Sequence, residues 1–494
     1  MEVTSSLFYK NIKSVPTPDS EEYLPFFLEE KNKIENGVTI DGVFFSGWLY
    51  WHLNHWKIYF DKEDEYKNIR RTFERPQARD NEFLAAEYLE RARIAKKGLC
   101  IFGSRRYAKA LKHGSKVYYK DKEGTIENVK VGDKIFGADG KLTKVTSVNP
   151  QGVKDLYEIT FLDGRKVTCC GEHLWKVFDK QTGTYKIVDT NYLFPRHKNL
   201  RIHNGYAISP KHIYETRFAI PLNSPVEYEE QPVKIDPYLF GLLLGDGSSY
   251  RTQITSVDEE IIQYCKKYCD GNNLILKKEK GSLYSYSMTS GNRGGNKKEN
   301  RTKNVLHTAL KELDYYNNKH IPKNYLYNSF ENRLALLQGI FDTDGTITKS
   351  GNMSITSSNP ILTKDIEFLV RSLGCGCRVT EKSSGYTING EKKECKNTFL
   401  ISIYTELPIC RLKRKLERQK LCLKGKQPKI NKVAIVDIKK VESDYATCIT
   451  VDNNDKLFLT DDFIVTHNSE IEASWLGRIG TMFKGSENIL VGSN

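Results

Sequence analysis

Three residues near the end of this 494-residue chain, His467, Asn468 and Ser469, have types suited to peptide-bond chemistry. An asparagine can attack its own backbone carbonyl through its side-chain amide, which forms a succinimide and cuts the chain after itself. A neighbouring histidine can polarise that bond or protonate the leaving amine, and a following hydroxyl can carry an acyl group. Alone, such a triplet is typical of a surface turn, so its meaning depends on its place in the chain.

A second candidate is a phosphate loop in two pieces. The segment GSRRYAK at residues 103–109 follows a short apolar run, but Ala110 stands where a loop of this kind needs Ser or Thr to hold magnesium. Ser469 opens a helical pattern far downstream, and deleting residues 110–468 joins the two pieces as GSRRYAKSEIEASWLGRIG. A chance loop explains residues 103–109 alone, but both ends together favour an insert at 110–468. The expected nucleotide-binding residues from this spacing are Gly103, Lys109 and Ser469.

The third candidate is a pair of apolar helices that end in aspartate, predicted at residues 236–246 and 329–344. Asp246 and Asp344 face the negative end of each helix dipole, which is unfavourable unless a cation compensates. Sites made of oxygen ligands suit Mg²⁺, and metals so held activate water for phosphodiester cleavage. A single copy favours an aspartate that only caps a turn, whereas two copies favour a metal site.

Charge supports this division of the chain. The formal net charge is +14, and residues 110–468 carry all of it, because residues 1–109 and 469–494 nearly balance. A basic block inside a neutral chain is typical of a polyanion-binding insert. The sequence contains no long apolar run and no secretory leader, so we expect no membrane partner. The 11 scattered cysteines argue for a reducing cytosol rather than a disulfide framework.

The predicted type of secondary structure, which must position these residues, changes along the chain. Residues 20–100 have a mostly helical pattern. From residue 114 apolar residues recur with period two, and Asp139-Gly140 and Asp163-Gly164 mark hairpin turns. Helical and strand patterns mix from 230 to 425, and strands return from 430. This order predicts nested rather than serial domains.

The joined ends, GSRRYAKSEIEASWLGRIG, resemble the ATPase portion of phage terminase large subunits, the DNA-packaging motors. Arg105 matches the second arginine of the deviant phosphate loop in that family, whereas Ala108 replaces the commoner glycine. The resemblance implies binding of ATP and Mg²⁺ only after the insert is removed, packaged DNA as a partner, and the cytoplasm of a bacterial host cell as the location. We expect the ATPase to be incomplete in this chain.

The edges of the insert resemble an intein, a self-splicing protein segment. ALKHGSKVYY looks like an intein start, RKVTCCGEHLWKV like its second motif, and the segment ending FIVTHN like its terminal motifs. Most inteins begin with Cys or Ser, so Ala110 is either an engineered replacement or a mark of class three inteins, in which an internal cysteine attacks. The resemblance implies these splicing residues: Cys448 as nucleophile, His173, Trp175, Thr466, His467, Asn468, Ser469 and the first residue Ala110. It implies no cofactor for splicing.

The paired helices resemble single-chain LAGLIDADG homing endonucleases. The resemblance implies Mg²⁺-dependent cleavage of double-stranded DNA, with Asp246 and Asp344 as metal ligands. Lys319, in NKHIPKN, matches the lysine that positions water, and Lys396 is the candidate for its counterpart in the second half. Thr343 replaces the small residue matched by Gly245, so helix packing is expected to differ there.

Together these patterns predict a multidomain precursor in which an all-β, horseshoe-shaped splicing domain of the Hint type is interrupted by an α+β endonuclease and flanked by halves of an α/β phosphate-loop ATPase. The predicted boundaries are 1–109 and 469–494 for the ATPase pieces, 110–229 and 428–468 for the splicing domain, and 230–427 for the endonuclease. Two alternatives remain: an ATPase with a DNA-binding insertion that is never excised, and an endonuclease whose splicing edges have decayed.

Overall fold

The structure is a computed structural model of residues 1–494. It describes residues 16–17, 20–40, 43–45, 47, 50, 58–63, 69–74, 110–200, 202–203, 206–207, 214–291, 304–382, 385–388, 391–394, 397–423 and 431–467. The chain divides into two compact units, one of residues 1–104 with 471–494 and one of residues 105–470. Among the helices that the structure describes, none has the length and apolar character needed to cross a bilayer.

The described part of the first unit corrects the helical expectation for residues 20–100. It contains one long helix, α2 (Tyr23–Asn36), and two antiparallel strand pairs. These are β1 (Val38–Ile40) with β2 (Val43–Phe45), and β3 (Ile58–Glu63) with β4 (Ile69–Glu74). The β3 and β4 sequences are rich in β-branched and aromatic residues, which favour strands over helices. The helix expected from residue 81 lies outside the described residues.

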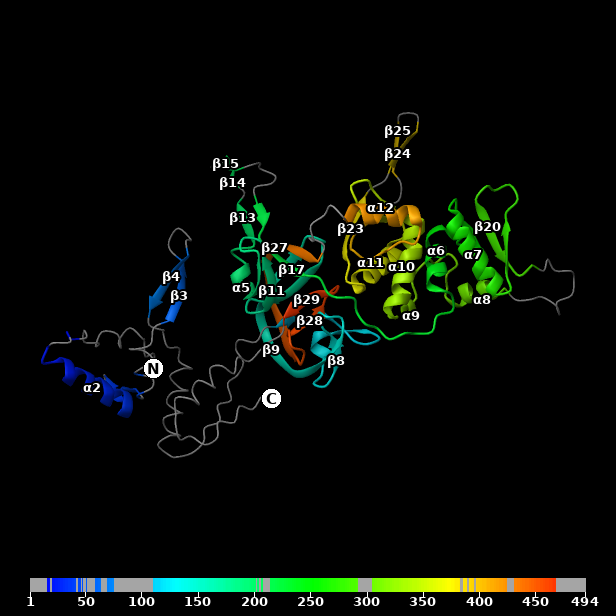
Figure 1. Ribbon diagram of the computed structural model, residues 1–494. Coiled ribbons are helices and arrows are strands. Elements are labelled where there is room, and N and C mark those ends of the chain that lie inside the picture. Colours follow the sequence, from blue (N-terminus) through cyan, green and yellow to red (C-terminus); the bar gives the residue numbers. More distant parts are fainter. Residues whose placement is uncertain are drawn as a thin grey trace. The chain divides into compact units, whose positions relative to one another are not determined.

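Strands dominate both ends of the second unit (Figure 1). An eight-stranded sheet has the order β12-β11-β17-β27-β5-β10-β9-β8, and a four-stranded sheet has the order β29-β28-β6-β7. The bounds are β5 (Leu111–Lys112), β6 (Lys116–Tyr118), β7 (Glu123–Thr125), β8 (Lys134–Phe136), β9 (Leu142–Phe161), β10 (Lys166–Cys170), β11 (Leu174–Asp179), β12 (Thr184–Asp189), β17 (Phe218–Pro221), β27 (Lys432–Val451), β28 (Leu457–Thr460) and β29 (Ile464–His467). Short elements between β12 and β17 are α5 (Thr190–Leu193), β13 (Lys198–Leu200), β14 (Ile202–His203), β15 (Tyr206–Ala207) and β16 (Tyr214–Thr216).

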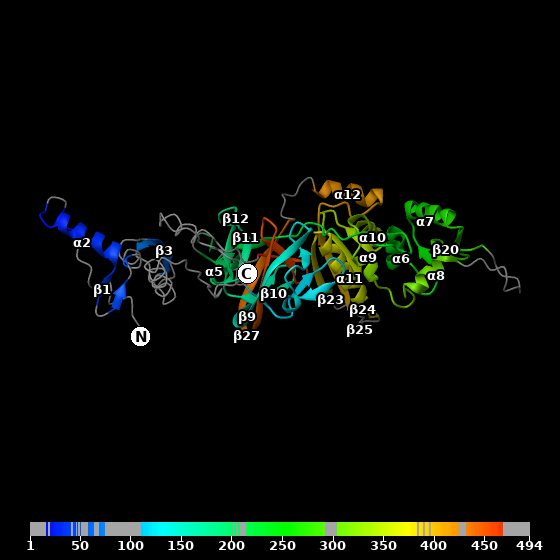
Figure 2. The ribbon, with the colours of Figure 1, turned by 90° about the horizontal axis from the view of Figure 1, so that it is seen from below.

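The two longest strands hold this β region together although they are far apart in sequence. β9 and β27 pair antiparallel over most of their 20 residues each and run beside one another in Figure 2. The expected hairpin turns are confirmed: Gly140 joins β8 to β9 with φ 81°, and Gly164 joins β9 to β10 with φ 91°. Glycine suits both turns because positive φ carries no steric cost without a Cβ.

The middle of the second unit mixes helices and strands in two similar halves. The first half contains α6 (Pro237–Asp246), β18 (Gln253–Thr255), α7 (Glu259–Gly271), β19 (Ile275–Lys278), β20 (Ser285–Thr289), α8 (Val305–Glu312) and α9 (Lys323–Leu326). The second contains α10 (Phe330–Asp344), β21 (Gly345–Ile347), β22 (Met353–Ser357), α11 (Pro360–Ser372), β23 (Gly376–Lys382), β24 (Gly385–Ile388), β25 (Glu391–Glu394), β26 (Thr398–Tyr404) and α12 (Lys413–Leu423). Each half supplies an antiparallel sheet, β18-β20-β19 in the first and β21-β22-β26-β23 in the second.

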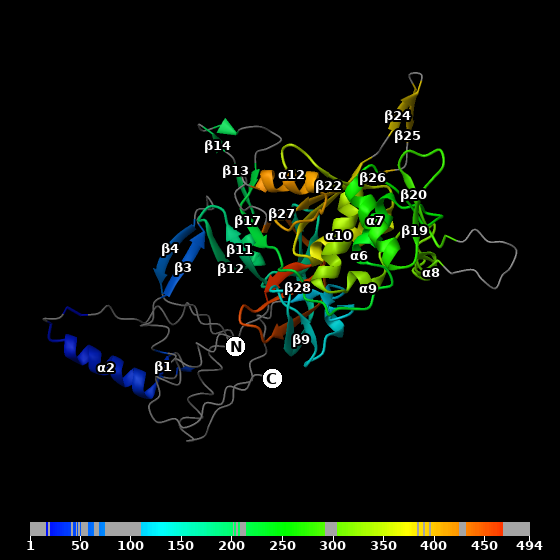
Figure 3. The same ribbon diagram turned by 45° about the vertical axis from the view of Figure 1, so that its right-hand side comes forward.

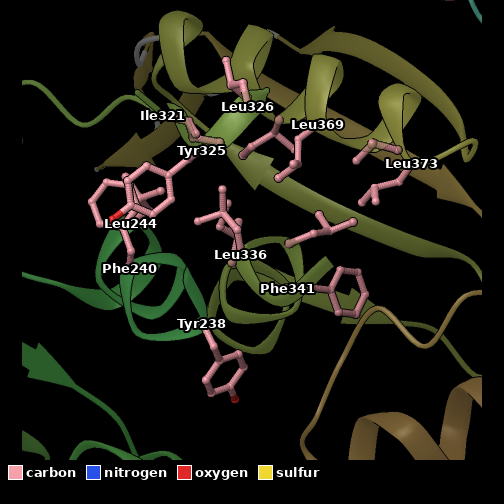
Figure 4. Close-up of a cluster of buried hydrophobic side chains, with 14 of the residues drawn as sticks. Tyr238, Phe240, Leu244, Ile321, Tyr325, Leu326, Leu336, Phe341, Leu369 and Leu373 are labelled. Carbon is pink, nitrogen blue, oxygen red and sulfur yellow. The ribbon is translucent and has the colours of Figure 1, made fainter. Parts of the chain in front are cut away.

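Helices α6 and α10 form the central pair of this region (Figure 3). Both begin as predicted, because Asp236 and Ser329 accept hydrogen bonds from backbone N–H groups of the first turn. Their apolar side chains pack with α9 and α11 around residues such as Phe240 and Leu336 (Figure 4). The helices meet closely because Gly241 and Gly339 have no side chains between the two backbones.

Candidate functional site

The start of the predicted insert lies between two cysteines from different strands. Strand β5 pairs with β10 on one side and β27 on the other, in registers that set Ala110 beside both Cys170 and Cys448. The Ala110 N–H donates to Cys170 Sγ at 3.1 Å, and the Cys170 N–H donates to the Ala110 carbonyl at 3.0 Å. All three residues are buried in one small apolar cluster. Burial raises the pKa of the Cys170 thiol to about 11, so this sulfur stays protonated near neutral pH.

His173, Trp175 and Thr466 form a second group, which converges on the histidine. His173 Nε2 lies 2.5 Å from the Thr466 hydroxyl, and the His173 and Trp175 rings are 5.0 Å apart. The Trp175 indole N–H donates to the Thr190 hydroxyl, which itself donates to the His173 carbonyl. The histidine is therefore held at its ring by Thr466 and at its backbone carbonyl by Thr190.

Thr466 and His467 lie on β29, which pairs with β28 in the order Phe458 to Thr466 and Leu457 to His467. Both are buried. β29 is therefore the strand that leads to the predicted downstream junction. The remaining predicted splicing and nucleotide-binding residues lie outside the described residues: Gly103, Arg105, Lys109, Asn468 and Ser469.

The two predicted metal aspartates end the paired helices, Asp246 on α6 and Asp344 on α10. Burial and the negative charge of Asp246 raise the pKa of Asp344 to about 6. Burial also raises the pKa of Asp246. Burial and mutual repulsion make it costly for both carboxylates to be ionised. A divalent cation bound between them would offset both effects, so the pair is suited to hold one.

Two lysines occupy equivalent positions at the ends of these helices. Lys319 Nζ donates to the carbonyls of Leu244 and Gly245, at 3.0 and 2.9 Å. Lys415 Nζ donates to the carbonyls of Phe341, Asp342 and Gly345, at 2.7 to 2.8 Å. Burial lowers the pKa of both lysines. Each ammonium neutralises the negative end of one helix beside its aspartate.

Lys415 was not among the predicted site residues, whereas the predicted counterpart Lys396 lies outside the described residues. The sequence does contain a signal for it. Lys319 follows Asp246 by 73 positions, and Lys415 follows Asp344 by 71.

The expected irregularity at Thr343 is accommodated by the glycine opposite to it. A Cβ on Gly245 would lie 1.9 Å from Thr343 Oγ1, so only glycine fits there. The nearby Asp342 has a different function from Asp344. It is buried and accepts hydrogen bonds from the Tyr238 hydroxyl and the backbone N–H of Arg411. Asp342 therefore fixes the loop before α12 rather than offering a free carboxylate.

Comparison with known families identifies part of this region. Residues 331–408, which contain α10 and Asp344, match the family described as LAGLIDADG-like domain. The chain therefore contains a domain of that type in the second half of its mixed region.

A curated relative, the replicative DNA helicase DnaB of Mycobacterium intracellulare, is 27% identical over 364 residues. The alignment covers 71% of this chain but only 57% of the relative, so this chain spans little more than half of its length.

Solved structures give weaker likenesses. The gp41-1 intein is 29% identical, with 17% of this chain and 59% of that chain covered and a TM-score of 0.15. The Msm DnaB1 intein splicing domain is 10% identical, covering 73% and 100%, with a TM-score of 0.22. Mesophilic variants of the homing endonuclease I-DmoI are 17% identical, covering 39% and 97%, with a TM-score of 0.24. TM-scores this low support no conclusion about this chain. None of the proteins named here is a packaging ATPase.

Proposed function

We propose that residues 110–468 are an intein that excises itself and joins Lys109 to Ser469. The observation that carries this proposal is the position of Ala110, whose N–H contacts Cys170 Sγ and whose apolar cluster includes Cys448. Ala110 has no nucleophilic side chain of its own, but the strands that pair with β5 place the buried Cys448 beside it. The division of the chain near residues 104 and 471 supports the nested arrangement.

In the first step the Cys448 thiolate attacks the Lys109 carbonyl. A thioester forms as the Lys109–Ala110 C–N bond breaks, and the Ala110 nitrogen leaves as an amine with a proton from His173. The Thr466 hydroxyl and the Trp175–Thr190 pair support the histidine, because they bind its ring and its carbonyl.

The later steps use the downstream junction. The Ser469 hydroxyl takes the acyl group and releases the Cys448 thiol. The Asn468 amide nitrogen then attacks its own carbonyl, which breaks the Asn468–Ser469 bond while His467 protonates the leaving amine. An acyl shift from oxygen to nitrogen leaves a normal Lys109–Ser469 peptide. Each step exchanges one bond for another, so splicing needs neither ATP nor a cofactor.

Expression of the intact chain under reducing conditions tests this proposal. Mass spectrometry should find an excised segment of residues 110–468 and a ligated product containing Lys109–Ser469. Cys448→Ala should abolish cleavage at both junctions, whereas Cys265→Ala, which also removes a buried thiol, should not. Recovery of only the full-length chain from the unchanged sequence would support the permanently inserted alternative.

Comparison of Cys448→Ala with Ala110→Cys decides how the first step occurs. If Cys448→Ala still splices, Ser469 attacks directly and the class three assignment is wrong. If only Ala110→Cys turns an inactive chain into a splicing one, Ala110 is a replacement for a nucleophile.

We also propose that residues 230–427 cleave double-stranded DNA as a homing endonuclease. The carrying observation is the pair Asp246 and Asp344, which ends two closely packed helices beside Lys319 and Lys415. The two carboxylates would hold Mg²⁺ and leave its remaining positions to water and DNA phosphate oxygens. Such a cation supplies charge stabilisation and an acidic water for phosphodiester hydrolysis. The lysines hold the helix ends that orient both aspartates.

The DNA-cleavage test uses the insert-free host gene as substrate, because a homing endonuclease must recognise the joined sequence. Cleavage should require Mg²⁺ and disappear with EDTA, Asp246→Asn or Asp344→Asn. Asp342→Asn is a less informative variant, because its hydrogen bonds hold the fold. Cleavage by either aspartate variant at the rate of the unchanged protein would refute the assignment.

For the host we propose a phosphate-loop ATPase whose loop is completed by splicing, with a terminase large subunit as the candidate from GSRRYAKSEIEASWLGRIG. Its partners would then be ATP and packaged DNA. The curated relative favours a second candidate, a replicative helicase, which is also a DNA-associated protein. The reading frame downstream of residue 494 distinguishes them, since a nuclease domain would follow only in a terminase.

A further inference from the structure

The segment directly before β29 contains a phenylalanine in a backbone conformation that this residue type disfavours. Asp462 and Phe463 have φ angles of 54° and 62°, in the left-handed region where a bulky residue such as phenylalanine is uncommon. A strained conformation of this kind persists only where the surrounding structure holds it. Because β29 carries Thr466 and His467, whatever holds residues 462 and 463 also fixes the start of this strand.

Part of the support comes from the β region itself. The Phe463 ring stacks on Tyr118 of β6, with centroids 4.2 Å apart and planes inclined by 11°. The buried side chain of Arg165, in the turn before β10, donates to the Asp462 carbonyl at 3.0 Å. β10 leads to Cys170, so this bond also links the upstream and downstream parts of the splicing site.

The remaining support comes from the endonuclease. The Phe368 ring of α11 meets the Phe463 ring edge-on, with centroids 5.1 Å apart. One helical turn later, Arg371 approaches the Asp462 carboxylate at 3.6 Å and also pairs with Glu367 at 2.6 Å. Residues three apart on a helix share one face, so α11 presents an aromatic and a cationic group to the same segment.

The end of α11 is itself fixed to the chain that leads into the endonuclease. The Val226 N–H donates to the Ser372 carbonyl at 2.9 Å, and the Asn223 amide donates to the Arg371 carbonyl at 3.1 Å. A Cβ on Gly374 would lie 2.7 Å from the Asn223 carbonyl oxygen, so the two backbones are in close contact. Helix α11 is thus held on its β-region side by several independent contacts.

We propose that α11 of the endonuclease is a positioning element for splicing, and that Phe368 and Arg371 hold residues 462 and 463 so that β29 presents the downstream junction. This inference rests on the proposed splicing function. It predicts that the endonuclease region contributes to the cleavage at Asn468 even when it cuts no DNA.

The kinetic test compares Phe368→Ala with Ile361→Ala, a matched control on α11 whose side chain is 55% exposed. Phe368→Ala removes aromatic pairs with both Tyr327 and Phe463. Loss of the Phe463 pair should slow cleavage at the downstream junction about 5- to 10-fold and leave cleavage at the upstream junction nearly unchanged. Phe368→Leu should recover only part of the rate, because it restores apolar bulk but not the aromatic pair. A second variant, Asp462→Asn, removes the Arg371 ion pair but tolerates positive φ, and should slow the same junction.

A second measurement does not depend on splicing. In an Asn468→Ala background, Phe368→Ala should accelerate amide hydrogen exchange across Ile464–His467 and leave the amides of α6 and α10 unchanged. Unchanged exchange together with an unchanged rate would overturn the inference while leaving splicing intact. Faster exchange throughout the endonuclease would also overturn it, because the effect would then be global. If the unchanged chain never splices, the proposed function fails, and the exchange experiment still decides whether α11 positions β29.

Discussion

Replacing Gly339 by alanine is the sharpest perturbation of the proposed endonuclease site. A Cβ at this position would lie 2.2 Å from the Tyr238 carbonyl oxygen, 2.8 Å from the Leu242 nitrogen and 2.9 Å from the Gly241 Cα. All three are backbone atoms of α6, so no side chain can rotate away. Since ordinary contact distances are about 3.5 Å, α6 and α10 must separate by about 1 Å.

Two opposing free energies set the expected stability change. Alanine favours a helix over glycine by about 1 kcal/mol, whereas overpacking a close contact costs about 1–3 kcal/mol. We therefore expect Gly339→Ala to lower the free energy of unfolding by up to about 2 kcal/mol. DNA cleavage should fall more steeply, by about 100-fold, because a 1 Å displacement of catalytic groups has that order of effect.

The control is Gly271→Ala at the end of α7, where an added Cβ meets no atom within 4 Å. It should leave the unfolding midpoint and the cleavage rate close to those of the unchanged protein. Urea denaturation and Mg²⁺-dependent cleavage of the insert-free gene measure the two effects separately. If Gly339→Ala cleaves DNA as well as Gly271→Ala does, the close approach of the helices does not set the distance between the aspartates.

Four further outcomes follow from the two sites. DNA cleavage should fall as the pH drops through about 6, because Asp344 then takes up a proton, and higher Mg²⁺ should move the midpoint to lower pH; a flat profile from pH 8 to 5 would contradict this. The raised pKa of Asp344 also affects the stability of the metal-free protein, because the folded state favours the protonated carboxyl. The stability that this proton binding contributes is fully present below the ordinary pKa of 3.8 and is lost as the pH rises through about 6. Thermal denaturation of Asp344→Asn and of the unchanged chain across this pH range measures it. Lys415→Met should reduce cleavage about as much as Lys319→Met, and normal cleavage by either would show that it only stabilises its helix end. Cys170→Ala should slow the upstream junction about 10-fold by removing a buried hydrogen bond, which time-resolved mass spectrometry of the products would detect.

Local patterns in the sequence predicted many of the helix starts, strands and turns. Asp236 and Ser329 predicted the starts of α6 and α10 because N-cap chemistry depends only on neighbouring residues. Period-two alternation likewise predicted strands in the β region, and Gly140 and Gly164 predicted its turns. The helical expectation for residues 20–100 was wrong at β3 and β4, whose β-branched and aromatic residues favour strands.

Relations across long distances in the sequence were harder to predict. Lys415 has no local feature that separates it from the other basic residues of α12, and only its spacing from Asp344 repeats that of Lys319. Thr190 gave no sign that it joins Trp175 to His173, since a hydrogen-bonded link from the start of α5 to a residue of β11 and to the loop before it depends on tertiary packing. The contact between Phe368 and Phe463 is of the same kind.

The insertion of one domain into another gives these long-range contacts a physical reason. The strands before and after the endonuclease, β17 and β27, pair with each other in the eight-stranded sheet, so the endonuclease joins the β region through two adjacent chain crossings. A domain held only there could pivot, and its motion would reach β27 and hence Cys448. The bonds from α11 to Asn223, Val226 and Asp462 resist that motion. The inserted domain is therefore held by contacts beyond its two chain crossings, one of them to the segment that leads into Thr466 and His467.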